Sequence, residues 1–175
     1  SNAHVALGRF RLSGIKGSSV GRSPRRAERH FYRAAALYKD REAQYELGLM
    51  YRKGLLGTKQ PKSAARWFGL SARKGHKQAQ AELGEMLFYG DGVRSNPVRG
   101  LVYITRAAAD SARSGLKSID DMRKEALKQA SAAQRDAAAK IISTLNLDED
   151  SFGGAGSKPG RKSKAKTTKP TPRSK

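Results

Sequence analysis

The chain has no cysteine among its 175 residues, and this absence excludes two kinds of structure. A chain without thiols has neither a disulfide framework nor a metal site built on thiolates. The same absence is compatible with the cytoplasm and with the periplasm, so it leaves the compartment open.

Long hydrophobic runs and β-branched residues are also scarce. No stretch approaches the roughly 20 apolar residues that a membrane-spanning helix needs, so we expect no membrane span. Alanine is abundant instead, which favours a helical core. The length fits one domain of ordinary size plus tails.

Acidic residues are few, since 15 Asp and Glu stand against 36 Lys and Arg and leave a formal charge of +21. Residues 151–175 hold eight of the basic residues and no acidic one, so the rest of the chain carries +13, which is +21 less those eight. Their glycine, serine, proline and lysine composition predicts a disordered tail. A charge of this size favours anionic partners, and the tail is a candidate for contact with a polyanion.

A leucine and glycine pair recurs along the chain. Leu47 and Gly48 reappear 36 residues later as Leu83 and Gly84, and a weaker copy stands at residues 7–8. A second glycine follows each of these glycines after six residues, and a proline comes next, at positions 14, 54 and 90 and at positions 24, 61 and 97 respectively. A unit of about 36 residues cannot bury its own apolar face, so we expect the units to stack on one another.

Each unit is expected to contain two helices. In the second unit, Ala43, Leu47, Met50 and Tyr51 have the spacing of one apolar helix face. The second glycine ends this helix, and the proline begins the next one, at a position where its missing N–H is tolerated. Gly48 inside the first helix costs about 1 kcal/mol against alanine, so its presence needs a packing reason. We expect the partner helix to approach there with its small residues, 71–72 in this unit and 107–108 in the next.

Residues 43–79 and 79–108 resemble the Sel1-like repeat, a relative of the tetratricopeptide repeat, because their leucine, glycine, proline and aromatic positions agree in spacing. The resemblance implies an all-α fold, an α/α solenoid of about three helix-turn-helix repeats, here 4–39, 40–75 and 76–117. It also implies an adaptor that holds a partner protein on its concave face and carries out no catalysis.

The two ends of the chain differ from the repeats. Ser1, Asn2 and Ala3 look like an expression scar, and the natural sequence then enters in mid-repeat at His4, so a signal peptide or earlier repeats would have been lost. Residues 118–147 are predicted to form one long alanine-rich helix that caps the solenoid. The alternative is a dimerising helix, and we expect a monomer.

No catalytic, cofactor-binding or metal-binding residues are predicted. His4, His30 and His76 occupy unrelated positions of the repeat, with no carboxylate or second histidine at ligand spacing. The glycines at 90 and 92 lack the lysine and hydroxyl residue of a phosphate-binding loop, so they indicate a turn between helices. No set of acid, base and nucleophile converges, and an enzyme is therefore the least favoured class.

Positions that the repeat leaves free are the candidates for partner binding. Tyr45, Leu49 and Arg52 lie on the side of the first helix away from the apolar stripe, and Ala81, Glu85 and Phe88 take corresponding places in the next unit. We expect Leu49 and Phe88 to be exposed and to line a groove for a peptide segment. Ordinary surface variation is the alternative interpretation of these residues.

Two functions compete. The first is an adaptor or regulator that binds a segment of another protein, and the second is a module that binds nucleic acid or an anionic envelope polymer through its basic body and tail. Small bacterial proteins of the Sel1-like type include secreted and periplasmic regulators of sensor kinases and of cell-surface polysaccharide production. Residues 100–110 are similar to the end of such a regulator, so a periplasmic or secreted location is favoured over a cytoplasmic one.

Overall fold

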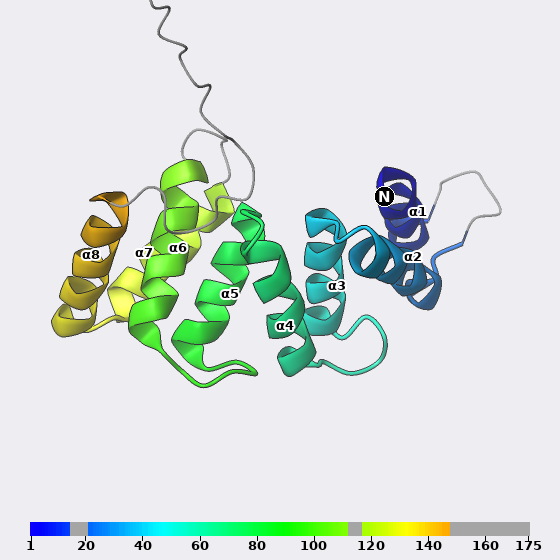
Figure 1. Ribbon diagram of the computed structural model, residues 1–175. Helices are drawn as coiled ribbons and strands as arrows, with labels where there is room; N and C mark the ends of the chain where they lie inside the picture. Colours follow the sequence, from blue (N-terminus) through cyan, green and yellow to red (C-terminus); the bar gives the residue numbers. More distant parts are fainter. Residues whose placement is uncertain (15–20, 112–116, 148–175) are drawn as a thin grey trace, which may run out of the picture.

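The computed structural model describes residues 1–14, 21–111 and 117–147. These residues form eight α-helices and no strand, which confirms the all-α prediction (Figure 1). In chain order the helices are α1 (Asn2–Ser13), α2 (Pro24–Leu37), α3 (Arg41–Lys53), α4 (Pro61–Ala72), α5 (Lys77–Tyr89), α6 (Pro97–Ser111), α7 (Lys117–Gln129) and α8 (Ala132–Leu147). None of the described helices combines the length and the apolar composition that crossing a membrane requires. The predicted tail, 151–175, lies outside the described residues.

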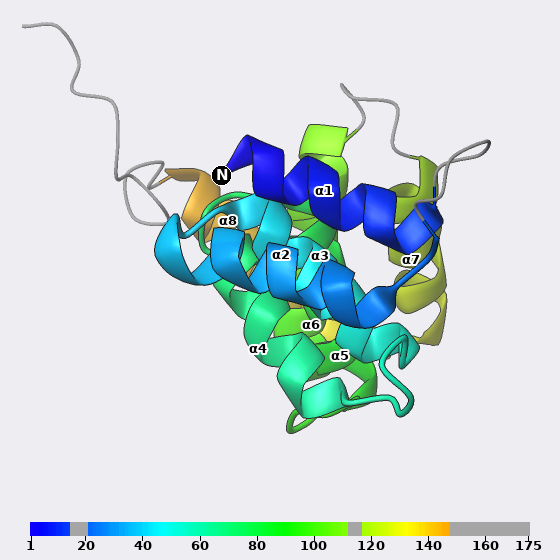
Figure 2. The same cartoon turned by 90° about the vertical axis from the view of Figure 1, so that its right-hand side faces the viewer.

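The helices form an α/α solenoid, as predicted. Helices α1 and α2 pack together, as do α3 with α4 and α5 with α6, and the second helix of each pair also contacts the first helix of the next. Figure 1 shows α1 and α2 at one end of the array and α8 at the other, and Figure 2 looks at the array from the α1 end. Helices α2 and α4 therefore each lie between two first helices, and α6 lies between α5 and α7.

The glycines and prolines of the repeat set the helix ends. The second helix of every unit begins at its proline, namely Pro24, Pro61 or Pro97. Helices α3 and α5 end at Gly54 and Gly90, whose φ angles of 69° and 79° lie in the left-handed region that favours glycine. Both expectations from the sequence are confirmed.

The glycine inside each first helix contacts a large side chain of the second helix. A Cβ atom added to Gly48 would lie 2.5 Å from the ring of Phe68, and one added to Gly84 would lie 2.7 Å from the side chain of Ile104. The weaker first copy repeats the arrangement, since a Cβ on residue 8 would lie 2.6 Å from the Phe31 ring. A close approach was expected, but its placement at residues 71–72 and 107–108 is wrong, because the large residue itself fills the space above the glycine.

The core runs along the array as a series of such contacts. Phe31, Phe68 and Ile104 are buried, and the leucine and methionine of α3, Leu47 and Met50, are buried against α2. The hydroxyl of Tyr51 also donates a hydrogen bond of 2.6 Å to Glu28 of α2. The apolar stripe predicted for the first helix is thus the surface that joins one unit to the previous one.

Residues 118–147 do not form the single helix that was predicted. Helix α7 ends at Gln129 and α8 begins at Ala132. Between them, Ser131 and Gln134 form a reciprocal cap, in which the Gln134 amide donates to Ser131 Oγ at 3.2 Å and the Ser131 amide donates to Gln134 Oε1 at 2.9 Å. This capping box starts a new helix, and α7 and α8 then both pack against α6.

Two glycine substitutions separate helix propensity from packing. We expect Gly48→Ala to lower the free energy of unfolding by about 1–3 kcal/mol, because the new methyl group overlaps the Phe68 ring. Gly69→Ala is the matched control inside α4, where nothing lies within 4 Å of an added Cβ. It should raise stability by about 0.5–1 kcal/mol. Urea unfolding followed by circular dichroism measures both, and equal effects would contradict the packing explanation.

Candidate partner-binding face

Long charged side chains join the first helices of successive units. Arg9 of α1 pairs with Glu42 and Glu46 of α3, and its Nε lies 2.7 Å from Glu46 Oε1. Arg52 of α3 pairs with Glu82 and Glu85 of α5. Each guanidinium thus faces two carboxylates on the next first helix, an arrangement that fixes orientation as well as adding attraction. We call the surface formed by these side chains the first-helix face, made of Arg9, Glu42, Glu46, Arg52, Glu82 and Glu85.

Burial and charge act against each other on this face. Burial raises the pKa of Glu82, although Arg52 acts in the opposite direction. The pKa of Glu42 is lowered, first by its hydrogen bond with His76 and also by the charge of Arg9, while burial opposes both. The carboxylates nearest to the two arginines are therefore held in different electrostatic surroundings.

Tyr45 lies between the charged residues of α3 and is half-buried. Its ring stacks on that of His76 with centroids 4.4 Å apart and an interplanar angle of 23°, and it is tilted against Phe68 at 5.9 Å. Burial, together with the nearby carboxylates, raises the pKa of its hydroxyl to about 12. Tyr45 therefore supplies apolar surface to this face, and its hydroxyl stays protonated.

His76 connects the same face to the start of α5. Its Nδ1 accepts a hydrogen bond of 3.2 Å from the Ala79 amide, so it caps the helix, and its Nε2 lies 3.0 Å from Glu42 Oε2. With Nδ1 accepting, the neutral ring carries its proton on Nε2 and donates it to Glu42. The sequence spacing did not indicate a carboxylate near this histidine, because Glu42 lies 34 residues away and only stacking of the units brings them together.

The other two histidines also meet. The rings of His4 and His30 lie with centroids 5.8 Å apart, which the sequence spacing did not indicate. Among the described residues no group of three His, Cys, Asp or Glu side chains has a geometry that could hold a metal ion.

The six residues predicted to bind a partner fall into two groups. Arg52 and Glu85 form an ion pair, and Tyr45 and Leu49 are partly buried beside them. Ala81 and Phe88, by contrast, are only 1% and 8% exposed. The expectation that Phe88 is exposed is therefore wrong, and Leu49 is only partly accessible.

The burial of Ala81 and Phe88 has a physical cause. Helix α5 contacts both α6 and α7, so a wider part of its surface is covered than in α3. Phe88 packs with Leu101 and Ile104 of α6, and Ala81 packs in a cluster that includes Ile119 of α7. Repeat register alone could not show this, because α7 belongs to no repeat.

The Sel1 repeat model matches three consecutive segments, residues 1–38, 41–76 and 77–111, which together make up more than half of the sequence. The chain belongs to the Sel1 repeat family. Sel1 repeat proteins generally mediate protein–protein interactions, and their fold is typically a non-catalytic scaffold.

Two curated relatives of this Sel1 repeat protein are exopolysaccharide production negative regulators. The protein from Rhizobium meliloti is 24% identical and that from Rhizobium leguminosarum bv. viciae is 26% identical, each over 149 residues and 85% of this chain. Because the alignment covers 54% of each relative, the chain spans about half the length of the curated relatives it matches.

Solved structures share the fold. A Sel1 repeat protein from Oxalobacter formigenes is 28% identical with a TM-score of 0.55, over 69% of this chain and 87% of that one. A protective antigen of uropathogenic Escherichia coli strains that displays an SLR fold also has a TM-score of 0.55, at 19% identity, over 92% of this chain and 43% of that one. The second likeness shows the fold alone.

The link between Glu42, His76 and Arg9 predicts a pH-dependent contribution to stability. A carboxyl whose pKa is lowered by folding stabilises the protein above its ordinary pKa of about 4.3, and this stabilisation is lost as the pH falls through the folded value. We expect the difference in unfolding free energy between the wild type and Glu42→Gln to be largest near pH 6 and to shrink below about pH 4.

Chemical denaturation at a series of pH values measures this difference. Asp136→Asn is the matched control, since Asp136 is an exposed carboxylate of α8 with no ion pair among the described residues. A Glu42→Gln difference in unfolding free energy that stays constant from about pH 3 to about pH 7 would contradict the ion-pair explanation.

Proposed function

We propose that this protein is a non-catalytic adaptor or regulator that binds a segment of a partner protein along the first-helix face. The observation that supports this proposal is the way the first helices are joined. Because α2 and α4 pack between them, α1, α3 and α5 are connected on this face by long side chains, those of Arg9 and Arg52 with their carboxylates. A surface bridged in this manner offers charged and partly exposed groups to a segment lying across several units.

The chemistry of the face suggests which segments fit. Its four carboxylates and two guanidinium groups leave a formal charge of −2, whereas the whole chain carries +21. Tyr45 and Leu49 add apolar surface between the charges. A partner segment with basic or amide side chains and one or two apolar anchors matches this surface better than an acidic segment does.

The names of two relatives support a regulatory role for the proposed adaptor. Two proteins similar to this chain are named as negative regulators of exopolysaccharide production. We accordingly propose a regulatory adaptor that acts as a monomer in the periplasm or outside the cell. A fusion to alkaline phosphatase, which is active only after export, tests the location; inactivity of the natural full-length fusion would contradict it.

The basic charge favours a second function. A chain with a formal charge of +21 and a lysine-rich terminal segment has the composition of a polyanion-binding module. Binding of this type falls steeply with salt, whereas binding across an apolar and ion-paired face is less sensitive. Salt dependence therefore discriminates between the two proposals.

A charge reversal on the first-helix face tests the leading proposal. We expect Glu42→Lys together with Glu85→Lys to reduce capture of the partner from a cell-envelope extract by about tenfold, because like charges across an interface cost more than about 1.4 kcal/mol. The control is Glu125→Lys together with Asp136→Lys, which changes exposed carboxylates of α7 and α8 and alters the net charge equally. Circular dichroism should show unchanged helicity for both.

The same capture experiment is run at two salt concentrations and with residues 151–175 removed. Partner capture that survives tail removal and high salt supports the adaptor. Equal capture by the face variant and its control would contradict it. Loss of every partner on removal of the tail alone would instead favour the polyanion module.

A further inference from the structure

The outward side of the second helices carries matching pairs of basic side chains. Helices α2 and α4 both begin with a proline, and in this register Arg25 and Arg29 of α2 correspond to Lys62 and Arg66 of α4. All four side chains are exposed. In each helix the two residues are four positions apart, so they lie on one side, separated by about 6 Å along the helix axis.

These positions are exposed in a unit that has neighbours on both sides. Helix α4 packs between α3 and α5, and Lys62 and Arg66 are nevertheless open to solvent. The exposure of Arg25 and Arg29 at the same register of α2 is therefore a property of the repeat and does not depend on the position of α2 near one end of the array.

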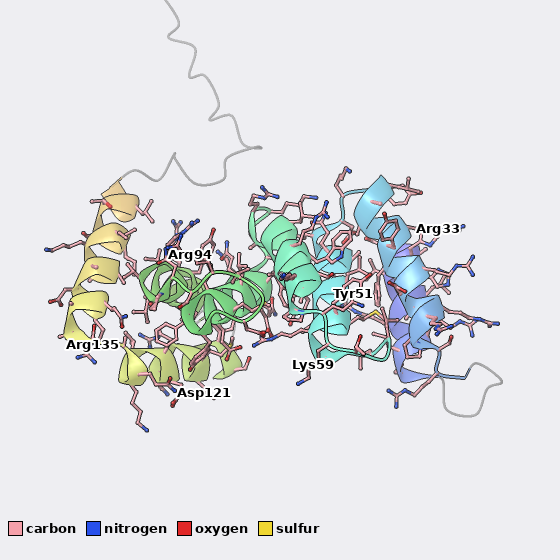
Figure 3. All side chains as sticks on the ribbon, turned by 90° about the horizontal axis from the view of Figure 1, so that it is seen from below. Arg33, Tyr51, Lys59, Arg94, Asp121 and Arg135 are labelled. Atoms are coloured by element: carbon pink, nitrogen blue, oxygen red, sulfur yellow. The ribbon has the colours of Figure 1, made fainter. Side chains whose placement is uncertain are left out.

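Other basic residues of α2 do not share this property. The counterparts of Arg26 and Arg33 in α4 are Ser63 and Leu70, which are half-buried. Figure 3 shows Arg33 at the end of the array opposite Arg135 of α8. Arg26 and Arg33 are therefore left out of the surface described below.

An aromatic contact brings α2 and α4 together on the outward side. The ring of Tyr32 meets that of Trp67 edge-on, with centroids 6.0 Å apart and an interplanar angle of 81°. Trp67 also packs against the core cluster that contains Phe31 of α2. Tyr32 follows Arg29 by three residues, and Trp67 directly follows Arg66. The contact thus places the charged pairs of the two helices side by side.

The surface around this contact is open. Tyr32 remains 54% exposed. Its counterpart in α4 is Gly69, and a Cβ atom added there would have nothing within 4 Å. An exposed ring on α2 and free space on α4 therefore accompany the basic side chains.

No acidic side chain neutralises this surface. None of the four basic residues forms an ion pair within the part of the chain that the structure describes. Glu28 is the one acidic residue in α2 and α4, and it accepts the hydrogen bond from Tyr51 of α3. The carboxylates of α3 and α5, by contrast, are engaged on the first-helix face. The positive charge on the outward side is thus uncompensated.

The open surface ends at α6. Val102 takes the register of Arg29 and Arg66, but it is only 9% exposed, because it packs in one cluster with Ala138 of α8. Helix α8 therefore covers the outward side of α6 at this register, and the basic surface is confined to α2 and α4.

We propose that this surface binds a linear polysaccharide that carries carboxylate groups. We call it the second-helix face, made of Arg25, Arg29, Tyr32, Lys62 and Arg66. The planar guanidinium groups donate paired hydrogen bonds to carboxylates, and the negative face of the tyrosine ring accepts the polarised C–H bonds of a sugar ring. The inference rests on the second proposed function, polyanion binding, and names the surface and the polymer for it.

The composition of the second-helix face separates this polymer from other anionic partners. The centre of a protein–protein interface is depleted in charged residues, whereas charged residues make up most of this face. Single-stranded nucleic acid stacks successive bases on a series of aromatic side chains, and α4 has Gly69 where α2 has Tyr32. One exposed ring between two charged pairs fits a single sugar ring held between carboxylates.

The test uses the full chain and labelled polymers. The main probe is a fluorescein-labelled oligogalacturonate of about ten sugars, which is longer than the roughly 10 Å between residues 25 and 32 along the helix. Its methyl ester has the same rings without the charges. Oligothymidylate and poly-glutamate with the same number of charges represent nucleic acid and acidic protein. Fluorescence anisotropy at about 0.15 M salt measures each affinity.

Two variants change the second-helix face. Arg25→Glu with Arg29→Glu and Arg66→Glu reverses its charge, and Tyr32→Ala removes the ring without altering the charge. Tyr32→Phe is the control that keeps the ring. Circular dichroism should show the helicity of the wild type for each of them, because the substituted positions are exposed.

A second control matches the change in net charge. Lys59→Glu with Lys128→Glu and Lys140→Glu makes the same change at exposed positions outside the second-helix face. Every variant keeps residues 151–175, so the eight basic residues of that segment contribute equally to all measurements.

We expect the charge-reversed variant to bind oligogalacturonate about tenfold more weakly and Tyr32→Ala about threefold more weakly. Tyr32→Phe and the lysine control should stay within about twofold of the wild type. The wild type should bind oligogalacturonate more tightly than its methyl ester, oligothymidylate or poly-glutamate. Glu42→Lys with Glu85→Lys should bind it at least as tightly as the wild type, so the first-helix face is tested separately.

The outcomes separate this inference from the function on which it rests. Equal losses in the lysine control and in the charge-reversed variant would leave polyanion binding by overall charge and overturn the second-helix face. Unchanged binding by Tyr32→Ala would overturn the sugar contact. Tighter binding of oligothymidylate or poly-glutamate would assign the face to nucleic acid or to an acidic protein. Binding of none of these polyanions by the wild type would contradict the second proposed function as well.

Discussion

The contact between a glycine of each first helix and a large side chain of the second sets the distance between the two helices of a unit. Gly8 meets Phe31, Gly48 meets Phe68 and Gly84 meets Ile104. A side chain at the glycine would push the pair apart, and because protein cores are densely packed the shift would pass to the next unit. The spacing of the first helices, and hence the reach of Arg9 and Arg52 to their carboxylates, depends on this contact.

Charge is distributed unevenly over this scaffold. The first-helix face is slightly acidic, while α2 carries arginines without acidic partners among the described residues. The charged residues of both regions lie outside the repeated core positions. A solenoid keeps its stacking positions constant and varies the remaining ones, so two surfaces of opposite charge fit on units that are built in the same way.

The sequence predicted the features that local chemistry determines. The period, the prolines that begin α2, α4 and α6 and the glycines that end α3 and α5 follow from backbone preferences. The features that it missed depend on contacts between distant residues, such as Glu42 with His76, or on the covering of α5 by α7, which buries Ala81. The break before α8 could have been predicted from the sequence, since Ser131 and Gln134 have the spacing of a capping box. The abundance of alanine around these residues favoured the prediction of one continuous helix instead.

A double-mutant cycle on Gly48 and Phe68 tests the central claim most directly. Gly48→Ala is measured in the wild type and in a Phe68→Leu background, with unfolding free energies from urea denaturation. If the methyl group is costly because it meets the ring, the two changes should couple, with Gly48→Ala costing at least about 1 kcal/mol less once the ring is gone. Costs that add within about 0.3–0.5 kcal/mol would contradict the claim that this contact sets the helix spacing.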